Sequence, residues 1–210
     1  MLSPMEKTTL NPSTLLAPVP VVLVSCRGTA GGEVDKNNLI TLAWAGVVCS
    51  DPPMVSISIR ESRYSHRQIS ESGEFVINLV HNDLLKATDY CGVKSGREVD
   101  KFTECQLTPV LAQGLETAPA VAESPLTLSC KVRQVIPLGS HDCFIAEVVA
   151  VEAASSLIDA ENRLCLEKAG LVAFCHGNYY ELGQMLGFFG FSVASEAVLA
   201  RRMPKKIKKK

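Results

Sequence analysis

Two adjacent prolines at positions 52–53 separate two strand-like runs in the middle of the chain. Proline has no amide hydrogen to donate to a sheet, so a proline pair ends a strand and makes the chain turn. The run before the pair, residues 38–49, is apolar, and the run after it, residues 54–60, alternates strictly. This alternation gives one face with two serines and an arginine and an opposite apolar face made of Val55, Ile57 and Ile59.

Further runs of the same kind predict more strands along the chain. They cover residues 19–26, 74–80, 126–137, 143–151 and 171–174. A helix is expected after residue 65, with Ser62 or Ser65 as its N-cap and Gly73 as its C-cap. A second is expected over residues 82–90, capped by Asn82 or Asp83 and closing at Cys91 and Gly92. Residues 107–123 are expected to form a connection.

These elements predict a mainly β fold, a β-barrel with a few helices packed at its ends. The strands do not alternate regularly with helices, which argues against a parallel sheet. The expected organisation is an irregular lead-in over residues 1–17, one domain over residues 18–195 and a basic tail over residues 196–210, expected to be disordered. No repeat or linker divides the central domain.

Charge is distributed unevenly along the chain. The last ten residues hold seven of the 21 basic residues and no acid, in a chain of net charge −1. The tail is interpreted as solvated, because no aromatic side chain interrupts it to stack on bases. Nucleic acid is therefore not an expected partner. Neither a membrane-spanning run nor a secretory signal is recognised, so a cytoplasmic location without membrane contact is expected.

The eight cysteines are scattered, with no CxxC pair and no zinc spacing. We therefore predict neither a metal site nor a disulfide, consistent with a reducing compartment. Phosphate-binding loops of the GxGxxG and GxxxxGK[ST] types are absent from the sequence, as are HEXXH and GxSxG. What the residues do suggest is an anion site near residues 60–65, where arginines and serines meet the expected start of a helix.

Two long segments carry a family resemblance. They are WAGVVCSDPPMVSISIRESRYSHRQISESGEFVINL and ATDYCGVKSGREVDKF. Over residues 17–192 the chain resembles the flavin reductase-like family of FMN-binding split barrels, particularly its flavoredoxin branch. The resemblance implies a Greek-key-like split β-barrel, a homodimer and one non-covalent FMN per subunit. The apolar aromatics of GFFGFS would then pack either across a partner subunit or inside the same chain.

The resemblance also implies which residues meet the flavin ring. Thr41, Ala43 and Trp44 would lie along the isoalloxazine and ribityl chain, with the small Ala43 permitting close approach. Cys49 and Ser50 would present backbone N–H groups and a hydroxyl. Cys49 is interpreted as a packing residue in preference to a redox thiol.

Phosphate binding is implied for Arg60 and Ser65, with Tyr64 and Arg63 as lesser candidates. Lys101 would approach the ring, where a cation near N1 and the C2 carbonyl stabilises the anionic reduced flavin. The alternative for Lys101 is an ordinary ion pair with Glu98 or Asp100.

The function implied is an FMN-dependent oxidoreductase with NADH or NADPH as electron donor. No catalytic side chain is predicted, because hydride transfer to the flavin needs no protein acid or base. The electron acceptor would be a small molecule or another protein. Two alternatives stay open: an FMN electron carrier between proteins, and a flavin-binding protein whose basic tail binds nucleic acid.

Overall fold

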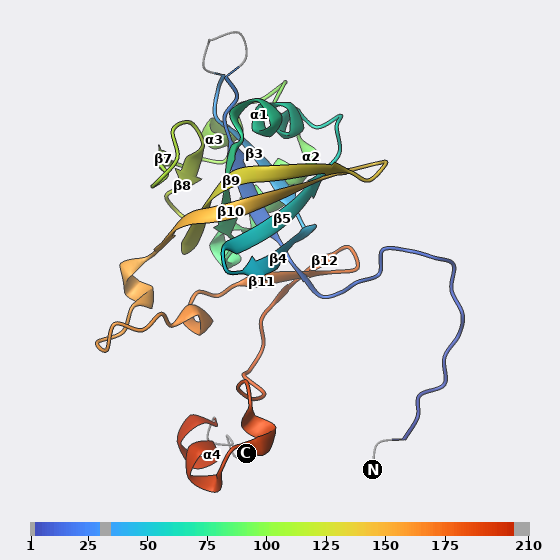
Figure 1. Ribbon diagram of the computed structural model, residues 1–210, viewed down its shortest axis with the longest axis vertical. Coiled ribbons are helices and arrows are strands. Elements are labelled where there is room, and N and C mark those ends of the chain that lie inside the picture. The colour runs from blue at the N-terminus through green and yellow to red at the C-terminus, as the bar shows by residue number, and fades with distance from the viewer. Residues whose placement is uncertain (1–2, 30–34, 204–210) are drawn as a thin grey trace.

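The computed structural model describes residues 3–29 and 35–203, and a curled antiparallel sheet forms its centre (Figure 1). Its strands are β2 (Val22–Cys26), β3 (Asn38–Leu42), β4 (Ala45–Ser50), β5 (Pro53–Ile59), β6 (Glu74–Leu79), β9 (Leu126–Pro137) and β10 (Asp142–Ala153). They hydrogen-bond in the order β3-β2-β6-β9-β10-β5-β4. Because β6 returns between β2 and β9 instead of beside β5, the order is Greek-key-like. The predicted mainly β fold is confirmed.

The sheet curls into a half-closed barrel around one core. Ile40 of β3 and Ile57 of β5 lie near opposite edges of the sheet, yet both belong to the same buried cluster. The alternation predicted for residues 54–60 is confirmed, since Val55, Ile57 and Ile59 are buried while the serines between them are half-buried. The buried row of β5 therefore fills the barrel interior.

The single strand predicted over residues 38–49 is wrong. The backbone breaks at Ala43 and Trp44, which separate β3 from β4. β3 pairs with β2, whereas β4 pairs with β5 on the opposite edge of the sheet. One straight strand cannot pair at both edges of the sheet, so the chain crosses from one edge to the other at Ala43 and Trp44. The Trp44 carbonyl accepts a hydrogen bond of 2.9 Å from the Ser58 amide, which fixes the crossing.

Helix α1 (Tyr64–Ser72) lies against one end of the barrel (Figure 1). Its predicted end is confirmed, because Gly73 adopts a left-handed conformation with φ of 68° and its N–H bonds the carbonyl of Ile69. The predicted N-cap is wrong. Arg63 occupies that position without a side-chain cap, and Ser65 lies inside the helix.

The second predicted helix is divided in two. Residues 82–84 form the 3-10 turn η2 (Asn82–Leu84), and α2 (Leu85–Val93) follows. Leu84 is therefore the N-cap of α2, in place of Asn82 or Asp83, and the helix continues past Cys91 to Val93. α3 (Lys101–Glu104) is one turn long and is capped by Asp100, whose carboxylate accepts from the Phe102 and Thr103 amides. Both helices pack on the outside of β2 and β3 around a second buried cluster.

Smaller elements complete the described chain. The strand predicted over residues 19–26 is interrupted at Val21, because its first part pairs with a separate sheet. The connection predicted over residues 107–123 contains a short hairpin. The remaining elements are β1 (Val19–Pro20), β7 (Pro109–Leu111), β8 (Pro119–Val121), η3 (Ser155–Leu157), η4 (Leu166–Lys168), β11 (Val172–Cys175), β12 (Asn178–Glu181), η5 (Phe191–Val193) and α4 (Glu196–Arg202). None of the described helices has the length and apolar character needed to cross a membrane.

Both ends of the chain extend away from the barrel (Figure 1). Residues 3–17 contain no helix or strand, and α4 forms within the region predicted to be a disordered tail. The end of the basic tail, residues 204–210, lies outside the described residues. The GFFGFS segment does not enter the core of its own chain, because Phe189 is fully exposed and Phe191 is 47% exposed. The intramolecular packing considered for this segment is therefore wrong.

Candidate functional site

A cleft of ≈ 570 Å³ opens where the break between β3 and β4 faces the end of β5. The break contributes Thr41, Ala43 and Trp44, and β5 contributes Ser58 and the following Arg60. The remaining walls come from α2, from further residues of β3 and β5, from Arg63 and from three segments distant in sequence. Together they are Val21, Ile40, Leu42, Ile59, Arg63, Asp89, Gly92, Val93, His141, Phe174 and Tyr179.

Trp44 and His141 stack at one wall of the cleft. Their ring centroids are 4.5 Å apart and their planes differ by 11°. Burial lowers the pKa of His141, and the charge of Arg60 lowers it further, so the imidazole is neutral at pH 7. His141 lies in the β9–β10 turn, which the sequence pattern marked only as a turn. Nothing in its local sequence places it beside Trp44, 97 positions away.

A second pocket of ≈ 290 Å³ shares Ile40, Arg60 and Arg63 with the cleft. Its lining, all within the described residues, contains five basic side chains and no acidic one. Four hydroxyl-bearing side chains add to the polar surface. These residues are Arg60, Arg63, Lys94, Arg97 and Lys101, with Ser62, Tyr64, Ser65 and Ser95. The residues predicted to form an anion site therefore line one pocket at the start of α1.

Tyr64 organises the basic side chains at this pocket. Two guanidinium groups lie over its ring, with Arg67 5.2 Å and Arg97 5.5 Å from the centroid. Arg97 also donates to the Ser62 carbonyl at 2.9 Å, which holds the loop after α2 against the start of α1. The sequence marked Arg97 only as part of a charged loop.

Lys101 is nearly inaccessible, with 3% of its surface exposed. Its ammonium donates to the carbonyls of Leu39 and Cys91, each at 2.7 Å. Burial lowers its pKa. The alternative of an ion pair with Glu98 or Asp100 is wrong, because the ammonium binds carbonyls and the Asp100 carboxylate caps α3.

Asn38 and Gly96 also line the pocket, and the sequence alone assigned neither a role. Asn38 is 2% exposed and donates to the Ser65 hydroxyl at 2.8 Å. Its Oδ1 has no hydrogen-bonding partner among the described residues. A Cβ at position 96 would collide with the Asn38 side chain and approach the Tyr64 ring to 3.0 Å. The glycine in the KSGR sequence was the one sequence feature that could have indicated this close approach.

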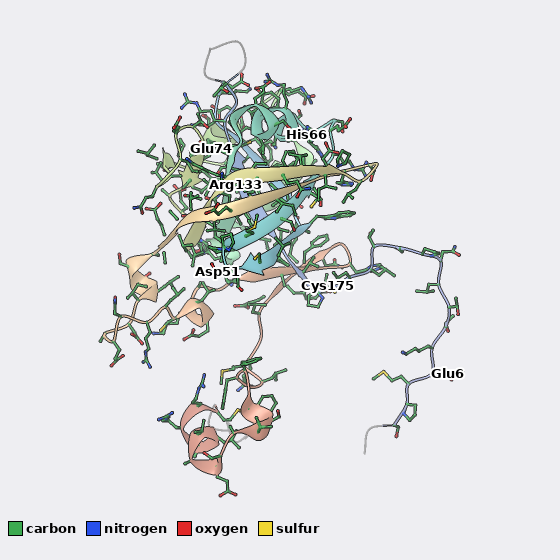
Figure 2. All side chains as sticks on the ribbon, viewed as in Figure 1. Glu6, Asp51, His66, Glu74, Arg133 and Cys175 are labelled. Atoms are coloured by element: carbon green, nitrogen blue, oxygen red, sulfur yellow. The ribbon has the colours of Figure 1, made fainter. Side chains whose placement is uncertain are left out.

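Cys49 and Ser50 lie outside both the cleft and the pocket. They end β4 beside the Asp51 turn, which Figure 2 shows away from His66 of α1. At about 3.3 Å per residue, Ser50 is roughly 20 Å along the strand from Trp44. The Cys49 thiol contacts the Asp51 carbonyl at 3.4 Å.

The geometry suits a specific kind of ligand. A wide cleft with aromatic walls opens into a pocket that is rich in cations and hydroxyl groups. Such a site accepts a flat aromatic group joined through a polar linker to a phosphate. Seven of the nine residues predicted for the site line it: Thr41, Ala43, Trp44, Arg60, Tyr64, Ser65 and Lys101.

Residues 15–183 match the flavin reductase like domain. The chain belongs to the flavin reductase-like family. Flavoredoxin of Desulfovibrio vulgaris (Miyazaki F) is similar with a TM-score of 0.81 and 32% identity, over 90% of this chain and 99% of that chain. Flavoredoxin from Methanosarcina acetivorans is similar with a TM-score of 0.78 and 27% identity, over 88% of this chain and 95% of that chain. The FMN reductase (NADH) RutF of Pseudomonas syringae is 28% identical over 147 residues, 63% of this chain and 80% of its own length.

As a flavin reductase-like protein, the chain has the fold that its sequence segments suggested. The predicted family and the predicted split barrel are both confirmed. The two segments that carried the resemblance supply part of the lining of the cleft and the pocket. The rest comes from Val21, from residues 38–43, from the β9–β10 turn and from the β11–β12 hairpin.

Proposed function

We propose that this flavin reductase-like protein binds FMN in the joined cleft and pocket and acts as an FMN-dependent oxidoreductase. One observation carries the proposal: an aromatic cleft continues into a cationic pocket without lining carboxylates, in a chain of this family. FMN combines a flat ring system, a hydroxylated ribityl chain and a phosphate. Each part has a complementary surface in the site.

The residues present fit this cofactor. The phosphate would be held by Arg60, Tyr64 and Ser65 at the start of α1, where helix N–H groups add favourable charge. The unpartnered Oδ1 of Asn38 is an acceptor in a pocket of donors, and a ribityl hydroxyl is the matching donor. Thr41, Ala43 and Trp44 would lie along the ring.

When bound, FMN supplies the capacity to accept a hydride and to release electrons singly or in pairs. The protein itself would bind the cofactor, orient it and tune its electronic properties. Lys101 lines the pocket and not the cleft that would take the ring, so its positive charge, fixed by two carbonyls, would favour the negative charge of the phosphate. Because hydride transfer needs no protein acid or base, we assign no catalytic side chain.

The electron donor that we propose is NADH or NADPH. The similarity to a protein named FMN reductase (NADH) supports a nicotinamide donor. The stacked Trp44 and His141 support it as well, because they offer an aromatic surface at the cleft and the imidazole is neutral. The similarity to two flavoredoxins favours a second candidate, an FMN electron carrier between proteins.

Anaerobic mixing of the FMN-loaded protein with NADH or NADPH separates the two candidates. Bleaching of the flavin absorbance at catalytic rates supports the oxidoreductase and contradicts a pure carrier. If the protein purifies colourless and titration with FMN leaves the flavin fluorescence unchanged, both candidates are wrong.

Two serine variants test the position of the site. We expect Ser65→Ala to weaken FMN binding about tenfold, the effect of one hydrogen bond to a charged group. Ser50→Ala serves as the matched control, because Ser50 lines neither cavity in this chain. If the control has the larger effect, the flavin binds at Cys49 and Ser50 and the cleft is not its site.

We further propose a homodimer in the cytoplasm that passes electrons to a small molecule or to another protein. The exposed apolar side chains of the C-terminal segment support the dimer, because a second copy would bury them. Eight free thiols support a reducing compartment.

A further inference from the structure

Two cysteines face each other behind the wall of the site. The Sγ atoms of Cys91, on α2, and Cys105, directly after α3, are 3.9 Å apart. All eight cysteines lie in the described part of the chain, and among them only this pair makes a sulfur–sulfur hydrogen bond. Cys91 is 1% exposed and Cys105 is half-buried.

The backbone of each cysteine is hydrogen-bonded to Lys101. The Cys91 carbonyl accepts a hydrogen bond from the Lys101 ammonium at 2.7 Å. The Cys105 amide donates to the Lys101 carbonyl at 3.1 Å. Gly92, next to Cys91, lines the cleft. A change in the distance between the two sulfur atoms would therefore act directly on the buried cation of the site.

We propose that Cys91 and Cys105 form a reversible disulfide that weakens cofactor binding through Lys101. The effect on the cofactor rests on the proposed function, whereas disulfide formation does not. To form the bond, the sulfur atoms must approach from 3.9 Å to about 2.05 Å. This movement draws α2 toward α3 and shifts the carbonyl that anchors the ammonium.

The oxidant that we propose is hydrogen peroxide. The Cys105 thiolate attacks one peroxide oxygen, the O–O bond breaks, hydroxide leaves and a sulfenic acid forms. Cys91 then attacks the Cys105 sulfur, the S–O bond breaks and a second hydroxide leaves as the S–S bond forms. The two thiol protons end on the two hydroxides. Overall, two thiols and one peroxide give one disulfide and two waters.

The difference in exposure between the two thiols determines the order of these steps. Cys105 is the more accessible thiol, so peroxide reaches it first, and the buried Cys91 resolves the sulfenic acid. Burial raises the pKa of Cys105 and raises the pKa of Cys91 to about 12. The charged groups nearby are Lys101, which lowers both values, and Glu104, which raises that of Cys105. Oxidation should therefore accelerate with pH up to and beyond pH 9.

The first test counts thiols in the full-length protein before and after peroxide treatment. We expect two thiols to disappear and dithiothreitol to restore them. Mass mapping should find the Cys91 and Cys105 peptides linked, with two hydrogen atoms missing. Cys105→Ser should abolish the loss, and the matched control Cys175→Ser should retain it. Eight persisting thiols, or a sulfinic acid at Cys105 without a link, would overturn the proposal.

The second test measures FMN binding by quenching of flavin fluorescence. The oxidised protein should bind about tenfold more weakly than the reduced protein, as expected when one hydrogen bond to a charged group is lost. Cys105→Ser should show no such difference after peroxide. Equal affinities with a mapped disulfide would overturn the coupling to Lys101. If the reduced protein does not bind FMN at all, the proposed function fails while the thiol count still stands.

Discussion

At the scale of single residues, Gly96 determines the shape of the pocket. Its backbone lies against Asn38 and the Tyr64 ring, and its φ is not in the left-handed region. The requirement is therefore for space and not for backbone freedom. A methyl group here would push Asn38 away from Ser65 and close the end of the pocket.

We predict that Gly96→Ala weakens FMN binding at least tenfold. The crowding should also lower the free energy of unfolding by about 1–3 kcal/mol. Fluorescence titration and urea denaturation measure the two effects. Gly46→Ala is the matched control, because a Cβ there meets nothing within 4 Å. An unchanged affinity in Gly96→Ala would mean that this end of the pocket does not contact the ligand.

Lys101 gives the site a pH dependence. Burial lowers its pKa below the ordinary value of 10.5. The protonated form attracts the anionic cofactor, so affinity should fall as the pH rises through this lowered pKa. We predict that the wild-type affinity for FMN falls with rising pH and that this fall begins before pH 10.5 is reached. The affinity of Lys101→Met should be weaker and should lack this fall. Titration of both proteins at several pH values measures the difference, and parallel curves would contradict it.

At the scale of elements, one contact joins the two ends of the site. His66 of α1 lies 2.8 Å from the Asp142 carboxylate, at the start of β10. Both side chains are largely buried, and His66 also packs edge-on against Phe144. Asp142 directly follows His141, which stacks on Trp44. The position of α1 therefore helps to fix the turn that carries His141.

We predict that His66→Ala loosens this turn and exposes Trp44. The variant leaves Asp142 without its partner, and stability should fall by about 1–3 kcal/mol. Trp44 is the sole tryptophan of the chain, so acrylamide quenching of its fluorescence reports on this stack alone. Quenching should increase in His66→Ala and stay constant in the control His176→Asn. An unchanged quenching constant would show that the turn is held without His66.

Some helices and strands could be predicted from the sequence, and others could not. Strand alternation located β5, and Gly73 located the end of α1, because both depend on backbone periodicity and local conformation. The division of residues 38–49 was missed, because the apolar run continues across the break. Only the pairing of β3 with β2 and of β4 with β5 requires the chain to change edges.

At the scale of the whole molecule, the C-terminal segment exposes large apolar side chains. Leu186, Phe189 and Val193 are each about nine-tenths exposed or more. These side chains are exposed to solvent, and the chain that leads into α4 lies away from the barrel (Figure 1). Burying such side chains against a second copy would contribute about 1.5–3 kcal/mol each.

We predict that the double variant Leu186→Ser, Phe189→Ser shifts the protein from dimer toward monomer in sedimentation velocity. Leu111→Ser is the control, since Leu111 is 83% exposed on the small β7–β8 hairpin. The control should sediment as the wild type does. A double variant that stays dimeric would place the dimer interface elsewhere on the barrel.

The sequence by itself determined the β-rich fold, the start of the anion site and the family, since these depend on local periodicity and on contiguous motifs. Tertiary structure decided which side chains meet. It buried Lys101 against carbonyls of Leu39 and Cys91, and it stacked His141 on Trp44. Such contacts arise from the curl of the sheet, which brings distant segments together in a way that no local pattern records.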